Sequence, residues 1–156
     1  MATDSVRSAS HQRLFVGRAL QHLGTAWVRE LGERLLEARW PTEAGFRPGC
    51  VGVMLCADRL GPASQKDISS EVGLDPSDLV GIIDILETAG LVARERDEAD
   101  RRRHAIVLTP LGRRRADELR KIVSELNETM LAPLDAPGRD TFVELLDTLV
   151  AHHRRR

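Results

Sequence analysis

The residues with the most suggestive chemistry are three consecutive arginines, Arg101, Arg102 and Arg103, in a charged stretch that also contains Asp97 and Asp100. The guanidinium group of arginine is planar, permanently charged and weakly hydrated, which suits the narrow and electronegative minor groove of DNA. The two aspartates would hold the stretch in shape and orient the arginines. The same pattern is also typical of a solvated turn stabilised by ion pairs, so its meaning depends on the elements that flank it.

The distribution of charge favours a nucleic-acid partner more than the total charge does. The net charge of the 156 residues is −1, but residues 94–121 contain ten basic and six acidic side chains, a local surplus of +4. Such a surplus can guide a protein to DNA even when the whole chain is nearly neutral. Hydrophobic residues make up 42% of the chain and charged residues 30%, which predicts one domain, or one core with an added dimerisation element.

Two short predicted helices joined by a tight turn lie in the middle of the chain. Ser64, with Asp67 three positions later, is typical of a helix N-cap, and Gly73 would end that helix. Asp75 and Pro76 mark the start of the second helix. The apolar face of this second helix would consist of Leu79, Ile82, Ile83 and Leu86. The two helices form a helix-turn-helix pattern.

A β-hairpin is predicted directly after the second helix, because the helical period is lost there. Residues 91–93 and 105–108 are apolar and β-rich, and residues 94–103 form a charged tip between them. Helices are expected on both sides of this centre. One begins near Pro48 and runs to residue 60, and the other runs from Thr109-Pro110 to about residue 131.

The first and last predicted helices carry more apolar surface than one small domain can bury. A helix over residues 10–39 repeats apolar side chains on a 3.6-residue period, at Val16, Leu20, Leu23, Trp27, Leu31 and Leu35. A last helix, capped by Asp135, has a similar stripe at Phe142, Leu145, Leu146 and Leu149, and residues 152–156 after it are expected to fray. We therefore expect the terminal helices to pack against a second copy of the chain.

Six short motifs place these elements in a known pattern. They are Ser64-Gln-Lys-Asp-Ile68, Gly73-Leu-Asp-Pro-Ser77, Asp84-Ile-Leu-Glu87, Gly90-Leu-Val92, Asp97-Glu-Ala-Asp-Arg-Arg102 and Leu108-Thr-Pro-Leu-Gly112. The charged tip followed by the Leu-Thr-Pro-Leu-Gly start of a helix is the most specific combination. With these motifs the chain resembles the MarR family of regulators, closely over about residues 50–120 and in arrangement alone outside them.

The resemblance implies a mainly α fold, in which a winged helix-turn-helix lobe with a small β-hairpin wing is joined to a dimerisation domain of N- and C-terminal helices. It puts the DNA-binding domain at residues 46–109 and the dimerisation helices at residues 1–45 and 110–156. Each lobe of the homodimer would place its recognition helix in the major groove and its wing in the minor groove. Arg102, the second arginine of the Asp-Arg-Arg motif, would enter the minor groove.

The recognition helix departs from the family in its charge. Its exposed face offers Ser77, Asp78, Val80, Gly81 and Asp84, with no lysine or arginine between residues 75 and 90. An aspartate can accept a hydrogen bond from cytosine and a valine can contact a thymine methyl group, but carboxylates repel phosphates. We therefore expect the wing to supply more affinity than this helix. The candidate DNA-binding residues are Ser64, Gln65, Ser77, Asp78, Val80, Gly81, Arg94, Arg101, Arg102 and Arg103, with Asp97 and Asp100 stabilising the wing.

The resemblance also implies a small aromatic or anionic effector, bound in the cleft between the dimerisation helices and the lobe. The candidate effector-binding residues are His11, Arg18, His22, Trp27 and Phe46. Arg18 and His22 are four residues apart and share a helix face. The alternative is that Trp27 belongs to the core stripe and that the histidines are ordinary surface residues.

No pattern in the sequence predicts an enzyme, a cofactor or a metal. The histidines and cysteines lack the spacing of a zinc site, and no nucleophile, phosphate-loop or dinucleotide motif occurs. Cys50 and Cys56 lie six residues apart in a predicted helix, about 240° around its axis, so they cannot form an intrachain disulfide. They are interpreted as buried thiols, with redox sensing as the alternative.

These observations lead to one functional prediction and one alternative. The chain is predicted to be a homodimeric, sequence-specific DNA-binding repressor that recognises a pseudo-palindromic operator and is released by a small molecule. The alternative is a protein-interaction or structural dimer that kept the fold and lost DNA binding. The chain starts without an apolar leader and has no run near 18 apolar residues, so we expect a cytoplasmic protein without membrane contact.

Overall fold

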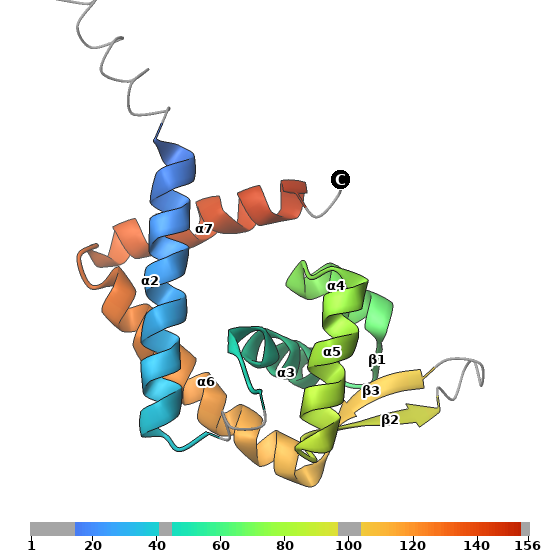
Figure 1. Ribbon diagram of the computed structural model, residues 1–156. Coiled ribbons are helices and arrows are strands. Elements are labelled where there is room, and N and C mark those ends of the chain that lie inside the picture. The colour runs from blue at the N-terminus through green and yellow to red at the C-terminus, as the bar shows by residue number, and fades with distance from the viewer. Residues whose placement is uncertain (1–14, 41–44, 97–103, 154–156) are drawn as a thin grey trace, which may run out of the picture.

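The computed structural model describes residues 15–40, 45–96 and 104–153, and it confirms the predicted mainly helical fold with a winged helix-turn-helix lobe. The elements are α2 (Val16–Glu37), α3 (Pro48–Leu60), β1 (Ala63–Ser64), α4 (Gln65–Val72), α5 (Pro76–Thr88), β2 (Val92–Arg96), β3 (His104–Leu108), α6 (Pro110–Leu131) and α7 (Ala136–His153). In Figure 1 the helices α3, α4 and α5 and the sheet form a lobe on one side. The long helices α2 and α7 lie on the other side, and α6 runs from beneath the lobe towards them.

The lobe has an aliphatic core to which almost every element contributes. The most deeply buried side chains include Met54 from α3, Ile68 from α4, Ile83 from α5, Ile106 from β3 and Leu119 from α6. The N-terminal half of α6 therefore packs in the lobe, and its C-terminal half extends away from the lobe, as Figure 1 shows. This packing fixes the positions of α4, α5 and the hairpin relative to one another.

The sheet has one strand more than the sequence predicts. β1 pairs antiparallel with β3, and β3 pairs antiparallel with β2, so the strand order is β1-β3-β2. Ala63 lies opposite Ile106 in the first pair, and Arg94 lies opposite the same residue in the second. The prediction that Arg94 belongs to the charged tip is wrong, because β2 extends through Arg96.

Helix starts are the features that sequence reasoning placed best. The Ser64 hydroxyl accepts from the Asp67 backbone N–H at 3.2 Å, and the Asp67 carboxylate accepts from the Ser64 N–H at 3.2 Å, a complete capping box. Thr109 accepts from the Gly112 N–H at 2.9 Å, and Asp135 accepts from the Gly138 N–H at 3.0 Å. Each cap satisfies a backbone donor that the helix itself leaves unpaired.

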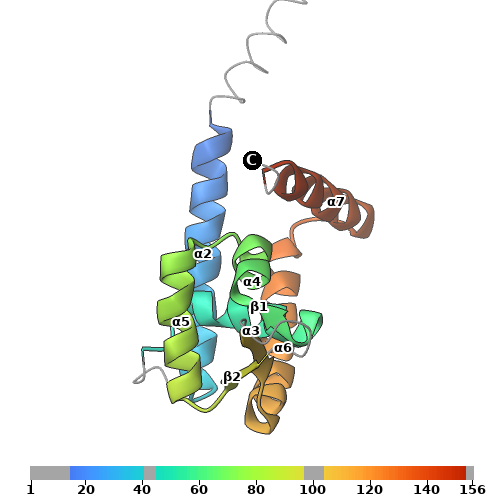
Figure 2. The ribbon, with the colours of Figure 1, turned by 90° about the vertical axis from the view of Figure 1, so that its right-hand side faces the viewer.

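The long helices end in two different environments. At the lower end of α2, Leu31 and Leu35 are fully buried where the helix packs on α6 and α3, while Leu20 near its upper end is 49% exposed. α7 has no buried residue, and it lies apart from the lobe in both Figure 1 and Figure 2. α7 is regular through His153, beyond the start of the predicted frayed segment. None of the helices in the described ranges is long and apolar enough to span a membrane.

Candidate nucleic-acid interface

A hollow of about 600 Å³ lies where the helix-turn-helix meets the wing. We call it the helix–wing hollow, and its lining consists of Ser64, Gln65, Lys66, Ser69, Pro76, Leu79, Val80, Arg94 and His104. These residues come from α4, α5, β2 and β3 together with the residue that precedes α4. The hollow thus brings together Ser64, Gln65, Val80 and Arg94, four of the predicted DNA-binding residues.

The two helices that border the hollow begin in rigid caps. At α5, the Ser77 backbone N–H and hydroxyl both donate to Oδ1 of Asp75, at 2.8 and 2.5 Å. The hydrogen bonds from Ser77 hold the pKa of the Asp75 carboxyl below its ordinary value. The hydroxyl proton of Ser77 is therefore occupied in the cap, and only its oxygen lone pairs stay available to an outside donor.

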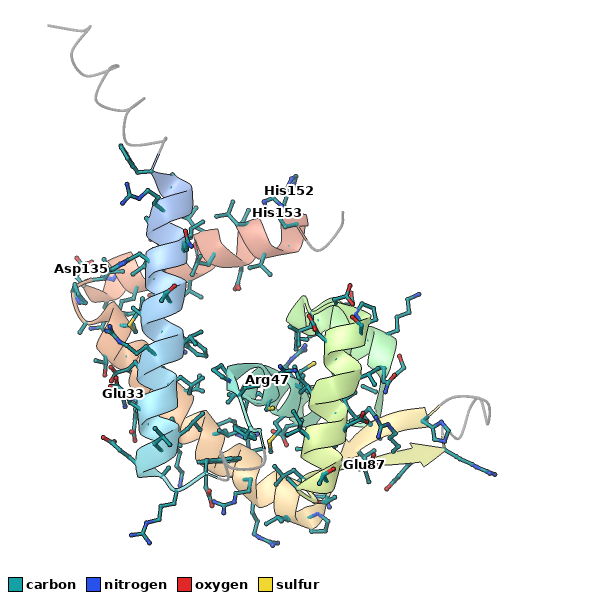
Figure 3. The ribbon with its side chains drawn as sticks, in the orientation of Figure 1. Glu33, Arg47, Glu87, Asp135, His152 and His153 are labelled. Carbon is teal, nitrogen blue, oxygen red and sulfur yellow. The ribbon has the colours of Figure 1, made fainter. Side chains whose placement is uncertain are left out.

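The predicted face of α5 is divided between two environments. Ser77, Asp78 and Val80 are exposed, and Val80 presents 42% of its surface to solvent. Gly81 is half-buried instead, and a Cβ atom at this position would lie 3.9 Å from Nη2 of Arg47. Figure 3 shows Arg47 close to α5 at the start of α3. An outside ligand therefore meets the first turns of α5 at Ser77 and Val80 more directly than at Gly81.

Arg94 contacts two carboxylates of α5. Its Nη2 lies 2.5 Å from Oδ1 of Asp84, and its Nη1 pairs with Glu87. Its backbone N–H also donates to Oε1 of Glu87 at 3.3 Å. The hydrogen bond with Asp84 raises the pKa of the Arg94 guanidinium above its ordinary value. The wing strand β2 is thus connected to the recognition helix by charge-assisted hydrogen bonds.

Sequence reasoning missed two basic residues of the hollow. Lys66 is exposed in the first turn of α4, and His104 is exposed at the start of β3. Their sequence signals are weak, because Lys66 merely follows the Ser64 cap and His104 merely follows the arginine cluster. The predicted wing residues Asp97, Asp100, Arg101, Arg102 and Arg103 lie outside the described residues, as does His11.

Residues 51–104, which contain the helix-turn-helix and most of the wing, match the sequence profile of the MarR family. An uncharacterised HTH-type transcriptional regulator of Bacillus subtilis, YwhA, is 33% identical over 91 residues, which are 58% of this chain and 66% of that protein. The sequence profile of the lobe and the fold of the chain are those of MarR-family regulators. Its matches span at most about two thirds of the length of these curated relatives.

Solved structures of MarR-family regulators share the whole arrangement. A MarR transcriptional regulator from Methanosarcina mazei Go1 superposes with a TM-score of 0.77 over 90% of this chain and 97% of its own, at 23% identity. CouR from Rhodococcus jostii RHA1, solved with p-coumaroyl-CoA, gives a TM-score of 0.75 over 86% of this chain and 91% of its own, at 26% identity. CouR has also been solved, as a transcriptional repressor, on a 23-mer DNA duplex. Family and fold are those of transcriptional regulators and not of enzymes.

The predicted effector residues do not line one common pocket. Arg18 and His22 are exposed on α2, whereas Phe46 is buried, with its ring centroid 4.9 Å from that of Trp40. The indole N–H of Trp27 donates to Oδ1 of Asn127 at 3.0 Å. Of the predicted effector residues in the described ranges, Trp27 alone lines a second hollow, an apolar groove of about 610 Å³. The groove is formed by Leu20, Leu23, Gly24, Trp27, Asn127, Met130, Leu131, Pro133, Leu134, Phe142, Val143 and Leu146.

Both cysteines are buried and are not joined by a disulfide, as the sequence predicts. Burial raises the pKa of the Cys50 thiol, although the Arg47 backbone N–H donates to its sulfur at 3.5 Å. The redox alternative stays a prediction. No cluster of His, Cys, Asp and Glu suited to a metal ion occurs in the part of the chain that the structure describes.

Proposed function

We propose that this protein is a homodimeric, sequence-specific DNA-binding repressor that a small-molecule effector releases from a pseudo-palindromic operator. The helix–wing hollow carries this proposal, because it unites the start of α4, the start of α5 and the base of the wing on one surface. In a winged helix-turn-helix these three parts approach the DNA backbone, the major groove and the minor groove. Residues of the right types occupy each of them.

Base recognition is assigned to the exposed start of α5. Ser77 retains acceptor lone pairs, and Val80 offers an apolar contact for a thymine methyl group. Lys66 and His104, which line the same hollow, are assigned to phosphate contacts. Arg102, from its position in the family motif, is assigned to the minor groove.

The dimer is assigned to the apolar surface of α2 and α7. Leu20, which lines the apolar groove between α2, α6 and α7, is 49% exposed, and Leu145 and Leu149 of α7 are 59% and 50% exposed. A soluble monomer rarely leaves so much contiguous apolar surface in water. A second copy that presents the same helices would cover it and set the spacing of two recognition helices for two half-sites.

The properties of CouR support the remaining parts of the proposal. CouR is described as a transcriptional repressor, and it has been solved both on DNA and with p-coumaroyl-CoA. We assign this chain an aromatic or anionic effector of the same general kind. Such a ligand would lower DNA affinity and raise the melting temperature together, because it stabilises the state that binds it. Phenolic acids and their CoA thioesters are the first compounds to test, and compounds that change neither quantity would contradict the effector.

The charge of α5 favours one alternative, an interaction module without DNA binding. Asp78, Asp84 and Glu87 are exposed on this helix, which carries no basic residue. Carboxylates that face phosphates weaken binding. On this alternative the hollow would bind a basic protein segment instead of a duplex.

DNA-binding isotherms decide between the two functions. Fluorescence anisotropy should compare the promoter next to the encoding gene with a random duplex of equal length, at two salt concentrations. We expect the protein to bind the promoter more tightly than the random duplex. Val80→Ala should weaken binding to the promoter and leave binding to the random duplex unchanged. Asp78→Ala should bind random DNA as well as the parent or better. Failure to bind any genomic fragment more tightly than random DNA would refute the repressor and leave the interaction module.

The proposed phosphate contacts can be recognised by the salt dependence of DNA binding. Lys66→Gln should weaken binding to every duplex and reduce the salt slope by about one unit per half-site. Lys121→Gln is the matched control, because it removes an equal charge from an exposed position on α6 outside the hollow. Arg102→Ala should weaken specific binding roughly 5- to 150-fold. If both Lys66→Gln and Arg102→Ala bind like the parent, the assignment of these contacts is wrong.

A further inference from the structure

The acidic character of the recognition helix is concentrated on the side that faces the wing. Asp84 and Glu87 lie one helical turn apart on α5, and Figure 3 shows Glu87 near the C-terminal end of that helix, beside the hairpin. Two carboxylates there would oppose a DNA duplex if nothing compensated for them. The compensation comes from the wing strand.

Arg94 supplies three hydrogen-bond donors to this acidic pair. One guanidinium nitrogen lies 2.5 Å from Asp84, the other pairs with Glu87, and the Arg94 backbone N–H donates to Glu87 at 3.3 Å. The Arg94 side chain is only 26% exposed, against 59% for Asp84. Both terminal nitrogens of the guanidinium are therefore engaged within the protein.

We propose that Arg94 is a positioning residue that fixes the wing strand β2 on the recognition helix and offsets part of the negative charge of Asp84 and Glu87, so that an acidic α5 can enter the major groove. The proposal rests on the proposed DNA-binding function and deepens it. It also reassigns Arg94, which sequence reasoning counted among the direct DNA contacts.

Two features of the geometry carry the proposal. First, α5 and β2 follow each other in the chain, and the Arg94 contacts join them a second time, at Asp84 and Glu87. Second, arginine is suited to this place because its planar fork can serve two carboxylates at once and keeps its charge throughout the physiological pH range. A lysine at position 94 would keep the charge and lose the two-pronged contact.

The positioning part is tested on the free protein by amide hydrogen exchange. Arg94→Ala and the double variant Asp84→Asn/Glu87→Gln remove opposite halves of the same contact. Both should accelerate exchange in β2 by about fivefold or more, because the strand opens locally more often. Arg59→Ala is the matched control, because it breaks an Arg–carboxylate pair with Glu71 elsewhere in the lobe, where nitrogen and oxygen are 2.7 Å apart. Unchanged exchange in β2 for the first two variants would overturn the positioning role.

The charge-offsetting part is tested by DNA binding of the same variants. Arg94→Ala exposes two uncompensated carboxylates and should weaken binding to specific and random duplexes roughly 10- to 100-fold. The triple variant with Arg94→Ala, Asp84→Asn and Glu87→Gln should recover most of that loss, since no charge is left to compensate. If Arg94 contacted a phosphate directly, the triple variant would bind as weakly as Arg94→Ala, and that result would overturn the proposal. If the parent binds no DNA specifically, the proposed function fails, while hydrogen exchange still decides the positioning role.

Discussion

The lobe of this protein buries its apolar side chains, whereas its two arms, the upper part of α2 and α7, leave theirs exposed. The lobe buries its leucines, isoleucines and valines inside one chain, with Ile83 and Ile106 fully excluded from solvent. The arms, formed by the upper part of α2 and by α7, leave theirs in water, and α7 buries none. One helix contains both situations, since Leu35 of α2 is buried and Leu20 is half exposed. The apolar stripe of α2 thus packs into the core of the lobe at one end of the helix, and at the other end it is exposed and available for association.

The largest effect is expected in the lobe, at the start of α6. A Cβ atom on Gly112 would lie 1.9 Å from the carbonyl oxygen of Leu91, which is rigid backbone. Gly112→Ala should therefore displace α6 from the lobe and lower the free energy of unfolding by roughly 4 kcal/mol. Chemical denaturation measures this loss. Gly52→Ala is the control, because the structure leaves open space at that exposed position of α3, and it should be neutral or stabilising.

Substitutions in the arms should change the dissociation constant of the dimer and not the stability of the folded chain. Leu20→Glu places a charge on the apolar groove and should weaken the proposed dimer by about 2–3 kcal/mol, roughly 30- to 150-fold in the dissociation constant. Sedimentation equilibrium measures it. Leu36→Glu, at a 62% exposed position of the same helix outside the groove, should leave the mass unchanged. A parent protein that is monomeric at micromolar concentration would contradict the contrast between lobe and arms.

Two helix caps of the same kind allow a direct comparison. Ser64→Ala removes the cap of α4 and should lower the unfolding free energy by about 1 kcal/mol. Asp135→Ala removes the cap of α7 and should reduce helicity by circular dichroism without changing the denaturation midpoint of the lobe. An equal loss of global stability in both variants would mean that α7 is part of the same cooperative unit.

The smallest effect is expected at the cysteines. Burial raises the pKa of the Cys50 thiol above its ordinary value of 9.0, so this thiol stays protonated at neutral pH and iodoacetamide should alkylate it only after unfolding. Because the folded pKa lies above the unfolded one, the contribution to stability is constant below about pH 8 and declines as the pH rises past 9. Peroxide treatment should leave DNA binding unchanged. Rapid alkylation of the native protein would instead support redox sensing.

The sequence predicted the helix boundaries because their causes are local. Ser64, Asp75 and Thr109 each accept a hydrogen bond from a backbone N–H two or three positions later, and such short-range rules can be read from adjacent residues. β1 was missed because two residues carry no periodic signal. That strand exists only because β3 lies beside it.

Two predicted site residues have neighbours in the structure that the sequence did not indicate. Arg94 was predicted to contact DNA directly, but its side chain pairs with Asp84 and Glu87 on α5, and a tertiary contact of this kind leaves no mark in residue spacing. Phe46 was assigned to an effector cleft, whereas it packs against Trp40 in the core. In both cases the sequence gives the type of the residue, whereas its neighbours in space depend on the fold.

The pairing of β1 with β3 has a consequence for how the protein is made. Ala63 meets Ile106 across the sheet, so this contact spans the whole helix-turn-helix and closes one of the longer loops in the lobe. During synthesis α4 and α5 are made before β3, and the core then still lacks Leu119 and Leu126 of α6. The recognition helix is thus synthesised before β3 and α6, and it gains its final position only when the last third of the chain has been made.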